Sequence, residues 1–318
     1  MSKERQVSKL IDSKIGKIDV IWNLTQECPW HCNICAVSAK PINSLRGSHE
    51  LNVEGKRRVL AQLASGNFEV DFSGGDPLYR EEDLLIIKEA TKILPKDLIS
   101  ISITGARFDE KRLEICKEVG SVEFTLDTLP GIENPARPQG YTESSIRGIL
   151  KCVERGVKTR AVTPLFPLTM RKENLQSVYR FLCECGCPEW ELLRFYPVGR
   201  GKTFLKDLPT DDDYRRIMDF VDGFRGFTKI VFQHSLRLLR GEGECPAVWK
   251  SIGILPNGEV TACAWAINEQ MEPISELFYL GKLPEENLEE IIRKGREKAE
   301  FRKVVKYCRI LDFLKHQI

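Results

Sequence analysis

Short apolar runs alternate with longer amphipathic segments through the first two thirds of the chain. Each run suits a buried strand, and each longer segment repeats apolar residues at the helical period. Right-handed crossovers would place such strands in parallel, which predicts an α/β fold built on a partial (β/α)6 barrel similar to a TIM barrel. The expected strands are residues 17–24, 68–72, 98–103, 122–126, 159–165 and 190–196, and the expected helices are residues 52–63, 84–94, 109–118, 144–154 and 175–183.

The pattern changes after Tyr196. An acidic stretch with helical periodicity, PTDDDYRRIMDF, is followed by short apolar runs and turns. In the run GILPNGEVTAC, an Asn-Gly pair flanked by Ile254 and Val260 predicts a β-hairpin. We therefore expect an N-terminal extension at residues 1–16, the barrel at 17–205, a linker helix at 206–228 and a small C-terminal α+β domain at 229–318.

Composition narrows the functional classes. The N-terminal stretch MSKERQVSKL lacks the apolar core of a signal peptide, and no run approaches about eighteen apolar residues. These features predict a cytoplasmic protein without a membrane partner. Eleven cysteines in a reducing compartment then favour metal or redox roles over disulfides. With 48 Lys and Arg against 46 Asp and Glu, a net charge of +2 argues against a nucleic-acid partner.

Three cysteines, Cys28, Cys32 and Cys35, follow the first expected strand in WNLTQECPWHCNICA. On a straight helix the first and last would be about 10 Å apart along the axis, whereas a loop that begins at Pro29 lets all three sulfurs face one point. One alternative is three buried thiols packed in a core. A second is a zinc site that His31 completes. A third is a [4Fe-4S] cluster, in which three thiolates leave one iron open.

The order C-x3-C-x2-C, with NLT before it and Ile34 before the third cysteine, resembles the signature of the radical S-adenosylmethionine (radical SAM) superfamily. The resemblance implies that Cys28, Cys32 and Cys35 hold a [4Fe-4S] cluster whose open iron chelates S-adenosylmethionine. It further implies an external one-electron reductant of the flavodoxin or ferredoxin type. Reduction would break the carbon–sulfur bond of the sulfonium, and a 5'-deoxyadenosyl radical would remove hydrogen from a substrate carbon.

Two glycine-containing motifs extend this resemblance. FSGGDP, at the end of the second expected strand, stands in the place of the superfamily's Gly-Gly-Glu motif. It assigns cofactor-binding roles to Gly74, Gly75 and Asp76, with Asp where the family usually has Glu. Paired glycines let backbone approach a ligand closely. The sixth strand ends in PVGRG, similar to a Pro-x-Gly-Arg segment of the family, which adds Gly199 and Arg200 as cofactor-binding residues.

The third and fourth expected strands add further candidates. EFTLDTLPGIENPARPQGYTES resembles the segment that holds the ribose and carboxylate of S-adenosylmethionine, and it assigns Thr125, Asp127 and Arg137 to that role. A guanidinium suits a carboxylate because the two can form paired hydrogen bonds. The third strand ends in SITGARF, which lacks the Asn of the family's Thr-Asn-Gly end, and contributes Thr104.

The C-terminal part carries a second cysteine pattern. Cys245, Gly258 and Cys263 have the spacing C-x12-G-x4-C, which resembles the start of SPASM and twitch domains. In one branch of the superfamily these domains hold auxiliary iron-sulfur clusters. The resemblance therefore implies an auxiliary [4Fe-4S] cluster and a SPASM or twitch-like domain at residues 229–318.

The ligand set of this auxiliary cluster departs from the family. The twitch pattern closes with Cys-x2-Cys, but here Cys308 is followed by Leu311. Three thiolates are then expected, from Cys245, Cys263 and Cys308. The fourth position is either open or taken by Asp312 or His316.

The remaining cysteines suggest packing. Cys116 and Cys152 fall on apolar helix faces, and Cys183, Cys185 and Cys187 fall where a helix leads into the sixth strand. That is the amino edge of the barrel, opposite the edge where barrel enzymes carry their active sites. We interpret all five as structural.

Function is expected to follow the resemblance: cleavage of S-adenosylmethionine and hydrogen abstraction, with the auxiliary cluster favouring oxidation or bond formation. Peptide-modifying relatives commonly carry a separate N-terminal peptide-binding domain, and only residues 1–16 precede the first strand. We therefore expect a small-molecule or short-peptide substrate. The alternatives are a peptide or protein maturase of the same superfamily, or a zinc-binding or electron-transfer protein that does not cleave S-adenosylmethionine.

Overall fold

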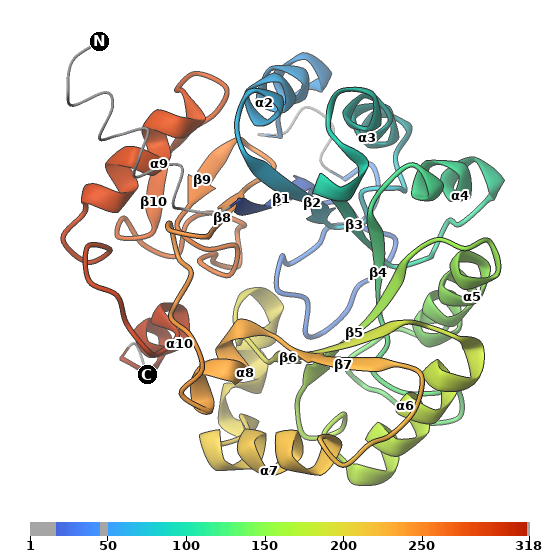
Figure 1. Cartoon of the computed structure of the whole chain (residues 1–318). Helices are drawn as coiled ribbons and strands as arrows, with labels where there is room; N and C mark the ends of the chain where they lie inside the picture. The colour runs from blue at the N-terminus through green and yellow to red at the C-terminus, as the bar shows by residue number, and fades with distance from the viewer. Residues whose placement is uncertain (1–16, 45–49, 317–318) are drawn as a thin grey trace.

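The computed structural model of the chain describes residues 17–44 and 50–316, and the expected extension at 1–16 lies outside them. Within these residues the strands form one continuous sheet in the order β10-β9-β8-β1-β2-β3-β4-β5-β6-β7 (Figure 1). The strands are β1 (Ile18–Thr25), β2 (Phe68–Gly74), β3 (Ile99–Ile103), β4 (Ser121–Thr125), β5 (Thr159–Leu165), β6 (Glu189–Arg194), β7 (Lys229–Phe232), β8 (Ser251–Ile254), β9 (Glu259–Thr261) and β10 (Tyr279–Lys282).

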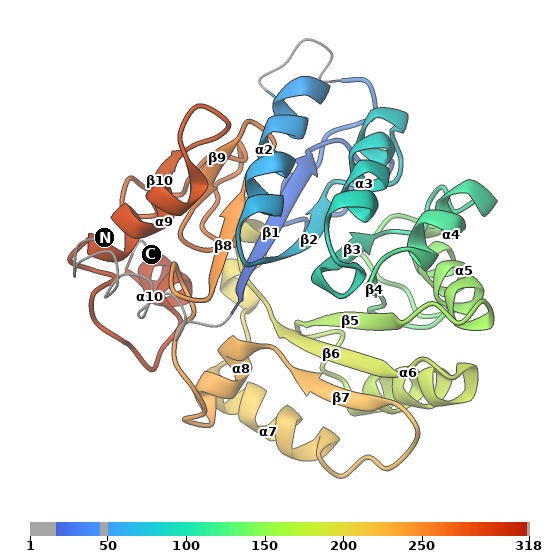
Figure 2. The ribbon, with the colours of Figure 1, turned by 45° about the horizontal axis from the view of Figure 1, so that its top comes forward.

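Strands β1 to β7 are parallel and curve into an open barrel, with helices along the outer side (Figures 1 and 2). The helices are α2 (Val53–Ser65), α3 (Glu81–Ile93), α4 (Glu110–Lys117), α5 (Tyr141–Glu154), α6 (Lys172–Cys185), α7 (Asp211–Val221), α8 (His234–Leu239), α9 (Leu288–Glu297) and α10 (Arg309–Lys315). Short 3-10 segments cover η1 (Lys96–Leu98) and η2 (Gly199–Asp207). This arrangement confirms the predicted partial barrel.

Polar residues at the first position stabilise several of the helix starts. The side chains of Asn52 and Asp109 accept hydrogen bonds from backbone amides in the first turns of α2 and α4. At α7, Thr210 and Asp213 form a reciprocal capping box. Each such cap satisfies an amide that the helix itself leaves unpaired and contributes about 1 kcal/mol.

The two faces of the barrel strands have opposite character. In β4, Val122 and Phe124 are fully buried, whereas Glu123 and Thr125 are partly exposed and line an internal cavity. The interior of a closed TIM barrel is normally filled with branched apolar side chains. Here the core lies between the sheet and the helices, and the polar inner face is left free for ligands.

The sheet continues beyond the six expected strands, which correspond to β1–β6. On one edge β7 pairs in parallel with β6, and on the other β8 pairs in parallel with β1. Both added strands lie in the segment that the sequence assigned to the C-terminal domain. The pattern did not reveal β7, because it has only four residues and none of them is fully buried. Strand β8 was expected as part of a hairpin, but its pairing with β1 was not. The domain boundaries themselves stay a prediction.

The expected C-terminal hairpin is present. Strands β8 and β9 are antiparallel, with Ile254 opposite Val260. Gly258 lies in the turn with a φ of 86°, and a Cβ there would lie 2.0 Å from the carbonyl oxygen of Leu283. Glycine is therefore required by both the backbone conformation and the close contact. Strand β10 then pairs with β9 and completes the sheet.

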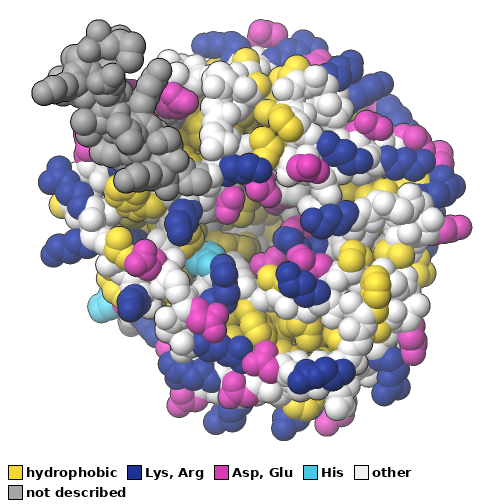
Figure 3. All heavy atoms as spheres, in the orientation of Figure 1, with side chains coloured by type: hydrophobic (Ala, Val, Ile, Leu, Met, Phe, Trp, Pro, Cys, Tyr) yellow, Lys and Arg dark blue, Asp and Glu magenta, His cyan; other side chains and the backbone are white. Residues whose placement is uncertain are grey.

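Charges of both signs are mixed over the face shown in Figure 3, and a hollow opens near its centre. This mixture matches the nearly equal numbers of basic and acidic residues in the chain. Among the helices of the described residues, none combines the length and the apolar character needed to cross a bilayer.

Candidate functional site

The three opening cysteines lie in the loop that follows β1, at the carboxyl edge of the barrel. Cys28 and Cys32 are buried and Cys35 is half-buried. The backbone amides of Trp30 and Ala39 donate to the sulfurs of Cys28 and Cys35 at 3.5 and 3.4 Å. Amide donors stabilise a thiolate, which is the form that binds metal.

Burial raises the pKa of the Cys28 and Cys32 thiols, because a thiolate loses its hydration. A bound cation would offset that cost, so metal binding should release protons. His31, the fourth ligand of the zinc alternative, is exposed beside the two buried cysteines. Within residues 17–44 and 50–316, no group of three or more His, Cys, Asp or Glu is placed to hold a single metal ion.

The glycine pair after β2 packs against the chain that leads into the cysteine loop. The amide of Gly75 donates to the carbonyl oxygen of Thr25 at 2.7 Å, and the amide of Asp76 donates to that of Glu27 at 3.0 Å. Gly74 has a φ of 119°, and a Cβ on Gly75 would lie 2.0 Å from the Glu27 oxygen. The sequence predicted that these glycines let the backbone approach a ligand closely. In the structure the backbone that they approach closely is that of Thr25 and Glu27.

Replacing Gly75 by alanine is expected to lower the free energy of unfolding by about 1–3 kcal/mol, because the added methyl must displace the Glu27 carbonyl. Urea denaturation of the apo protein measures the change. The control is Gly223→Ala, where the nearest atom to the new Cβ is the Phe220 oxygen at 3.3 Å. Equal stability of the two variants would contradict the close packing of the Gly74-Gly75 turn.

A short chain of hydrogen bonds connects the cysteine loop to the ends of β2 and β3. The Trp30 indole donates to the Thr104 hydroxyl at 3.2 Å, and that hydroxyl donates to the buried Asp76 carboxylate. The other oxygen of Asp76 accepts from the Leu78 amide at 3.1 Å. Asp76, which does not line the cavity, thus fixes the orientation of the Thr104 hydroxyl, which does. Sequence reasoning missed Trp30, although its position between Cys28 and Cys32 was a usable signal.

Arg137 lies between a carboxylate and a cysteine. Its Nε donates to Asp127 at 2.6 Å, and its guanidinium lies 4.6 Å from the centre of the Tyr141 ring. Arg137 also lowers the pKa of the Cys32 thiol through its charge and a hydrogen bond, against the larger effect of burial. The predicted Arg137 and Asp127 are thus brought together, and Arg137 is presented beside the cysteine loop.

Gly199 and Arg200, which follow β6, contact the backbone of the loop that carries Cys32 and Cys35. The Arg200 amide donates to the Cys35 carbonyl at 3.0 Å, and its guanidinium donates to the carbonyls of Cys32 and Ala39, each at 2.7 Å. A Cβ on Gly199 would lie 2.2 Å from the Ala36 oxygen, so only glycine lets the two segments meet. The sequence predicted that these residues bind the cofactor, whereas their contacts in the structure are with the loop that carries the cysteines.

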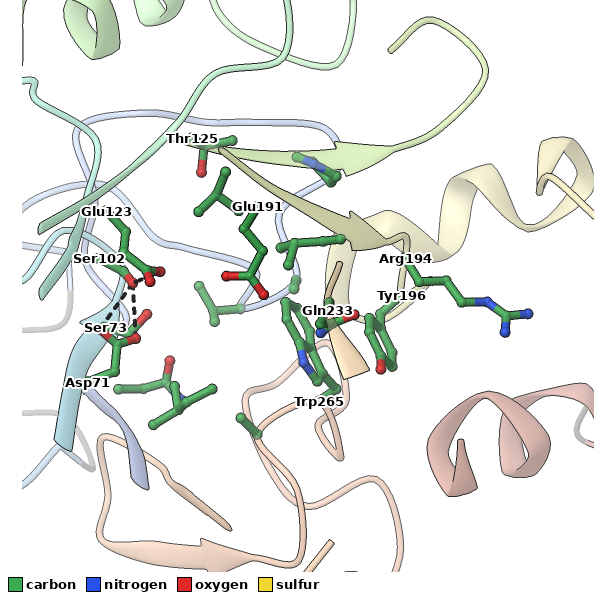
Figure 4. Close-up of a pocket in the computed structure, with 18 of the residues that line it drawn as sticks. Asp71, Ser73, Ser102, Glu123, Thr125, Glu191, Arg194, Tyr196, Gln233 and Trp265 are labelled. Carbon is green, nitrogen blue, oxygen red and sulfur yellow. Dashed lines mark hydrogen bonds between the residues drawn. The ribbon is translucent and has the colours of Figure 1, made fainter. Parts of the chain in front are cut away.

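One cavity of about 770 Å³ runs through the barrel (Figure 4). It reaches from the cysteine loop to the C-terminal segment, where Cys263 and Trp265 line it. The predicted residues that line it are Cys28, Cys32, Cys35, Gly74, Gly75, Thr104, Thr125, Arg137 and Cys263. Asp76, Asp127, Gly199 and Arg200 stand behind this lining as supports.

Carboxylates from three strands meet at the inner wall of the cavity. The Ser102 hydroxyl lies 3.0 Å from Asp71 and 3.1 Å from Glu123, and Glu191 projects from the opposite side (Figure 4). Arg160 donates to Glu123 at 2.6 Å and to Glu191 at 3.2 Å. Burial, followed by the charge of Glu123, raises the pKa of both Asp71 and Glu191 to about 7. The sequence signal was a charged residue inside each of three expected strands, which we did not use.

The raised pKa of Asp71 predicts a pH dependence of stability. The native state holds this proton more tightly than the unfolded chain, so the free energy of unfolding should fall as pH rises from about 4 to about 7. Asp71→Asn should reduce that fall by on the order of 1–2 kcal/mol. Urea denaturation of the apo protein at pH 5 and pH 7.5 measures it. The exposed Asp97→Asn variant is the control, and an identical pH dependence in both variants would rule out the effect.

The second cysteine set lies in the C-terminal segment. Cys263 follows β9, Cys308 immediately precedes α10, and both are buried, while Cys245 is half-buried before β8. Burial, followed by the charge of Cys308, raises the pKa of Cys263, which places these sulfurs within electrostatic reach of each other. His316 is exposed, and its Nδ1 lies 2.8 Å from the Asp312 carbonyl oxygen. The identity of the fourth ligand stays a prediction.

Comparison with family models gives two matches. Residues 22–182 match the radical SAM superfamily, and residues 245–310 match the SPASM iron-sulfur cluster-binding domain. The first match contains Cys28, Cys32 and Cys35, and the second contains Cys245, Cys263 and Cys308. Together the two matches span both ends of the cavity.

Individual relatives agree with this picture. Over 217 residues the chain is 27% identical to the Fe-coproporphyrin III synthase of Methanosarcina barkeri, which covers 66% of this chain and 52% of the relative. It is 32% identical over 167 residues to the PqqA peptide cyclase of Bradyrhizobium diazoefficiens, covering 50% and 40%. The chain thus spans about half the length of the curated relatives it matches, or less.

The fold also resembles a solved structure. Streptococcus suis SuiB bound to its precursor peptide SuiA has a TM-score of 0.72 and 16% identity, covering 94% of this chain and 69% of that one. At this identity the likeness concerns the fold alone.

The matched families specify the cofactors: S-adenosylmethionine with a [4Fe-4S] cluster, and an auxiliary iron-sulfur cluster in the SPASM domain. The residues fit, because Cys28, Cys32 and Cys35 line one end of the cavity, and Cys263, which lines the other end, interacts electrostatically with Cys308 and Cys245. The match to the radical SAM family favours the iron-sulfur cluster over the zinc site that would use the exposed His31. The chain belongs to the radical SAM superfamily and carries a SPASM domain in its C-terminal part.

Proposed function

We propose that this radical SAM enzyme reductively cleaves S-adenosylmethionine and removes a hydrogen atom from a small-molecule or short-peptide substrate held in the barrel cavity. The observation that carries the proposal is the continuity of that cavity, which Cys28 and Cys32 line at one end and Cys263 lines at the other. Its volume of about 770 Å³ lies in the range of sites that hold small molecules.

The residues of the site have separate roles in this proposal. Cys28, Cys32 and Cys35 hold the first cluster, which when bound with S-adenosylmethionine supplies one-electron cleavage of the sulfonium and hydrogen abstraction. Arg137 orients the methionine carboxylate, and Asp127 holds its guanidinium in place through hydrogen bonds to Nε at 2.6 Å and Nη2 at 3.3 Å.

Residues outside the cavity lining hold the lining residues in position. Thr104 is held between the Trp30 indole and the Asp76 carboxylate, so its hydroxyl has a fixed position. Arg200 ties the cysteine loop to the end of the sixth strand. A rigid wall that excludes water protects a reactive radical from side reactions, which is the main contribution that a protein makes to such chemistry.

The auxiliary cluster, held by Cys245, Cys263 and Cys308, favours an oxidation or a bond-forming reaction over a simple reduction. A flavodoxin or ferredoxin type of protein would supply the first electron. A peptide substrate is the second candidate. It is favoured by the 32% identity to a PqqA peptide cyclase and by the fold shared with peptide-bound SuiB.

Anaerobic reconstitution with iron and sulfide, followed by dithionite and S-adenosylmethionine, tests the proposal. We expect about eight irons per chain and the formation of 5'-deoxyadenosine. About four irons with 5'-deoxyadenosine would retain the cleavage activity and remove the auxiliary cluster. Bound zinc without iron uptake or 5'-deoxyadenosine would overturn the proposed function.

A further inference from the structure

Tyr196 lies between the substrate cavity and the auxiliary cysteines. It follows β6, is 3% exposed and contributes to the lining of the cavity. Its ring is stacked on that of Trp265, with the centres 4.6 Å apart and an angle of 3° between the planes (Figure 4). At its other end, the Tyr196 hydroxyl lies 3.4 Å from the sulfur of Cys308.

The direction of the hydrogen bond follows from the state of Cys308. A thiol and a phenol could each donate, but a cysteine that ligates iron is a thiolate and has no proton to give. The phenol must then be the donor.

A neighbouring hydroxyl could compete for this proton. Ser235 also contacts the Tyr196 hydroxyl, but its own proton goes to the Gln233 side chain at 2.6 Å. Between the Ser235 oxygen and the Cys308 thiolate, the charged sulfur is the stronger acceptor, since charge-assisted hydrogen bonds are about twice as strong as neutral ones.

We propose that Tyr196 is a positioning residue that donates a hydrogen bond to the Cys308 thiolate and thereby raises the reduction potential of the auxiliary cluster. Reduction adds negative charge that is shared by the ligating sulfurs, so a donor at one sulfur stabilises the reduced form more than the oxidised form. The inference rests on the proposed role of Cys308 as a cluster ligand.

Tyr196→Phe is the direct test, because it removes the hydroxyl and keeps the ring that stacks on Trp265. The expected result is an unchanged iron content and a fall of the auxiliary-cluster midpoint potential. A tenfold change in the one-electron equilibrium corresponds to a fall of about 59 mV. EPR-monitored redox titration of the reconstituted two-cluster protein measures it, and the potential of the first cluster is an internal control.

Tyr214→Phe is the matched control. Tyr214 is equally buried, and its hydroxyl donates to the Leu165 carbonyl at 3.2 Å, away from the auxiliary cysteines. Both variants lose one buried hydroxyl, but only Tyr196→Phe should shift the auxiliary potential. A shift no larger than that of Tyr214→Phe would overturn the inference while the proposed function stands.

Two other outcomes would also be decisive. Loss of auxiliary iron in Tyr196→Phe alone would overturn the hydrogen bond and assign the phenol oxygen as an iron ligand. Absence of auxiliary iron in the wild-type protein would overturn the ligand role of Cys308, and with it both the auxiliary part of the proposed function and the inference.

Discussion

Replacing Cys32 by alanine is expected to remove about four irons per chain and to lower 5'-deoxyadenosine formation more than about 100-fold. Cys32 is one of only three thiolates in the opening loop, and second-sphere changes alone can cost 10–100-fold in metal affinity or activity. Anaerobic reconstitution, iron determination and chromatography of 5'-deoxyadenosine measure both effects. The auxiliary irons should remain, because Cys245, Cys263 and Cys308 belong to a different part of the chain.

Cys185→Ala is the control for this loss. Cys185 is partly exposed at the end of α6, and its thiol contacts the Leu182 carbonyl at 3.4 Å, at the amino edge of the barrel. It should keep the full iron content and full cleavage activity. If Cys32→Ala still formed 5'-deoxyadenosine at the wild-type rate, the assignment of the opening cysteines would be wrong.

Replacing Cys263 by alanine is expected to remove the auxiliary irons and to leave the first cluster in place. Cys263 is buried, lines the cavity and interacts electrostatically with Cys308. Its loss would deprive the auxiliary cluster of one of the three thiolates that we propose as ligands. Cleavage of S-adenosylmethionine without substrate should continue at about the wild-type rate. Iron content, EPR spectra and 5'-deoxyadenosine measure the three parts of this result.

A second variant separates ligand loss from damage to packing. Cys263→Ser preserves the size of the side chain but replaces the soft sulfur that iron-sulfur clusters require. Circular dichroism should show both Cys263 variants folded. An unchanged iron content in either variant would contradict the auxiliary site, and loss of all iron from both would show that the two clusters depend on one another.

Much of the fold could be predicted from the sequence, because β1–β6 are buried runs separated by amphipathic helices. The cysteine loop was identifiable from spacing alone, since three thiols in eight residues after a strand have few structural explanations. Arg137 and Asp127 were also predicted, and the structure pairs them beside Cys32. Asp127 and Arg137 are only ten positions apart in the chain, so one loop can bring them into contact. A contact of this kind can be expected from a short stretch of sequence.

Other features depend on contacts between distant segments. Arg200 supports the carbonyls of Cys32 and Ala39, about 160 residues earlier in the chain, and no local pattern reports such a contact. Strand β8 pairs with β1 across most of the sequence. The raised pKa of Glu191 arises from its burial, followed by the charge of Glu123, and both depend on how the sheet folds rather than on the local sequence.

The pairing of β8 with β1 restricts how the molecule can move. Trp22 lies opposite Ile254 in this pairing. The loop with Cys28, Cys32 and Cys35 follows β1, and Cys263 follows the hairpin that β8 begins. Opening the protein by a hinge between the barrel and the C-terminal segment would break a parallel ladder. We therefore expect the sheet to hold the spacing between the two cysteine regions constant.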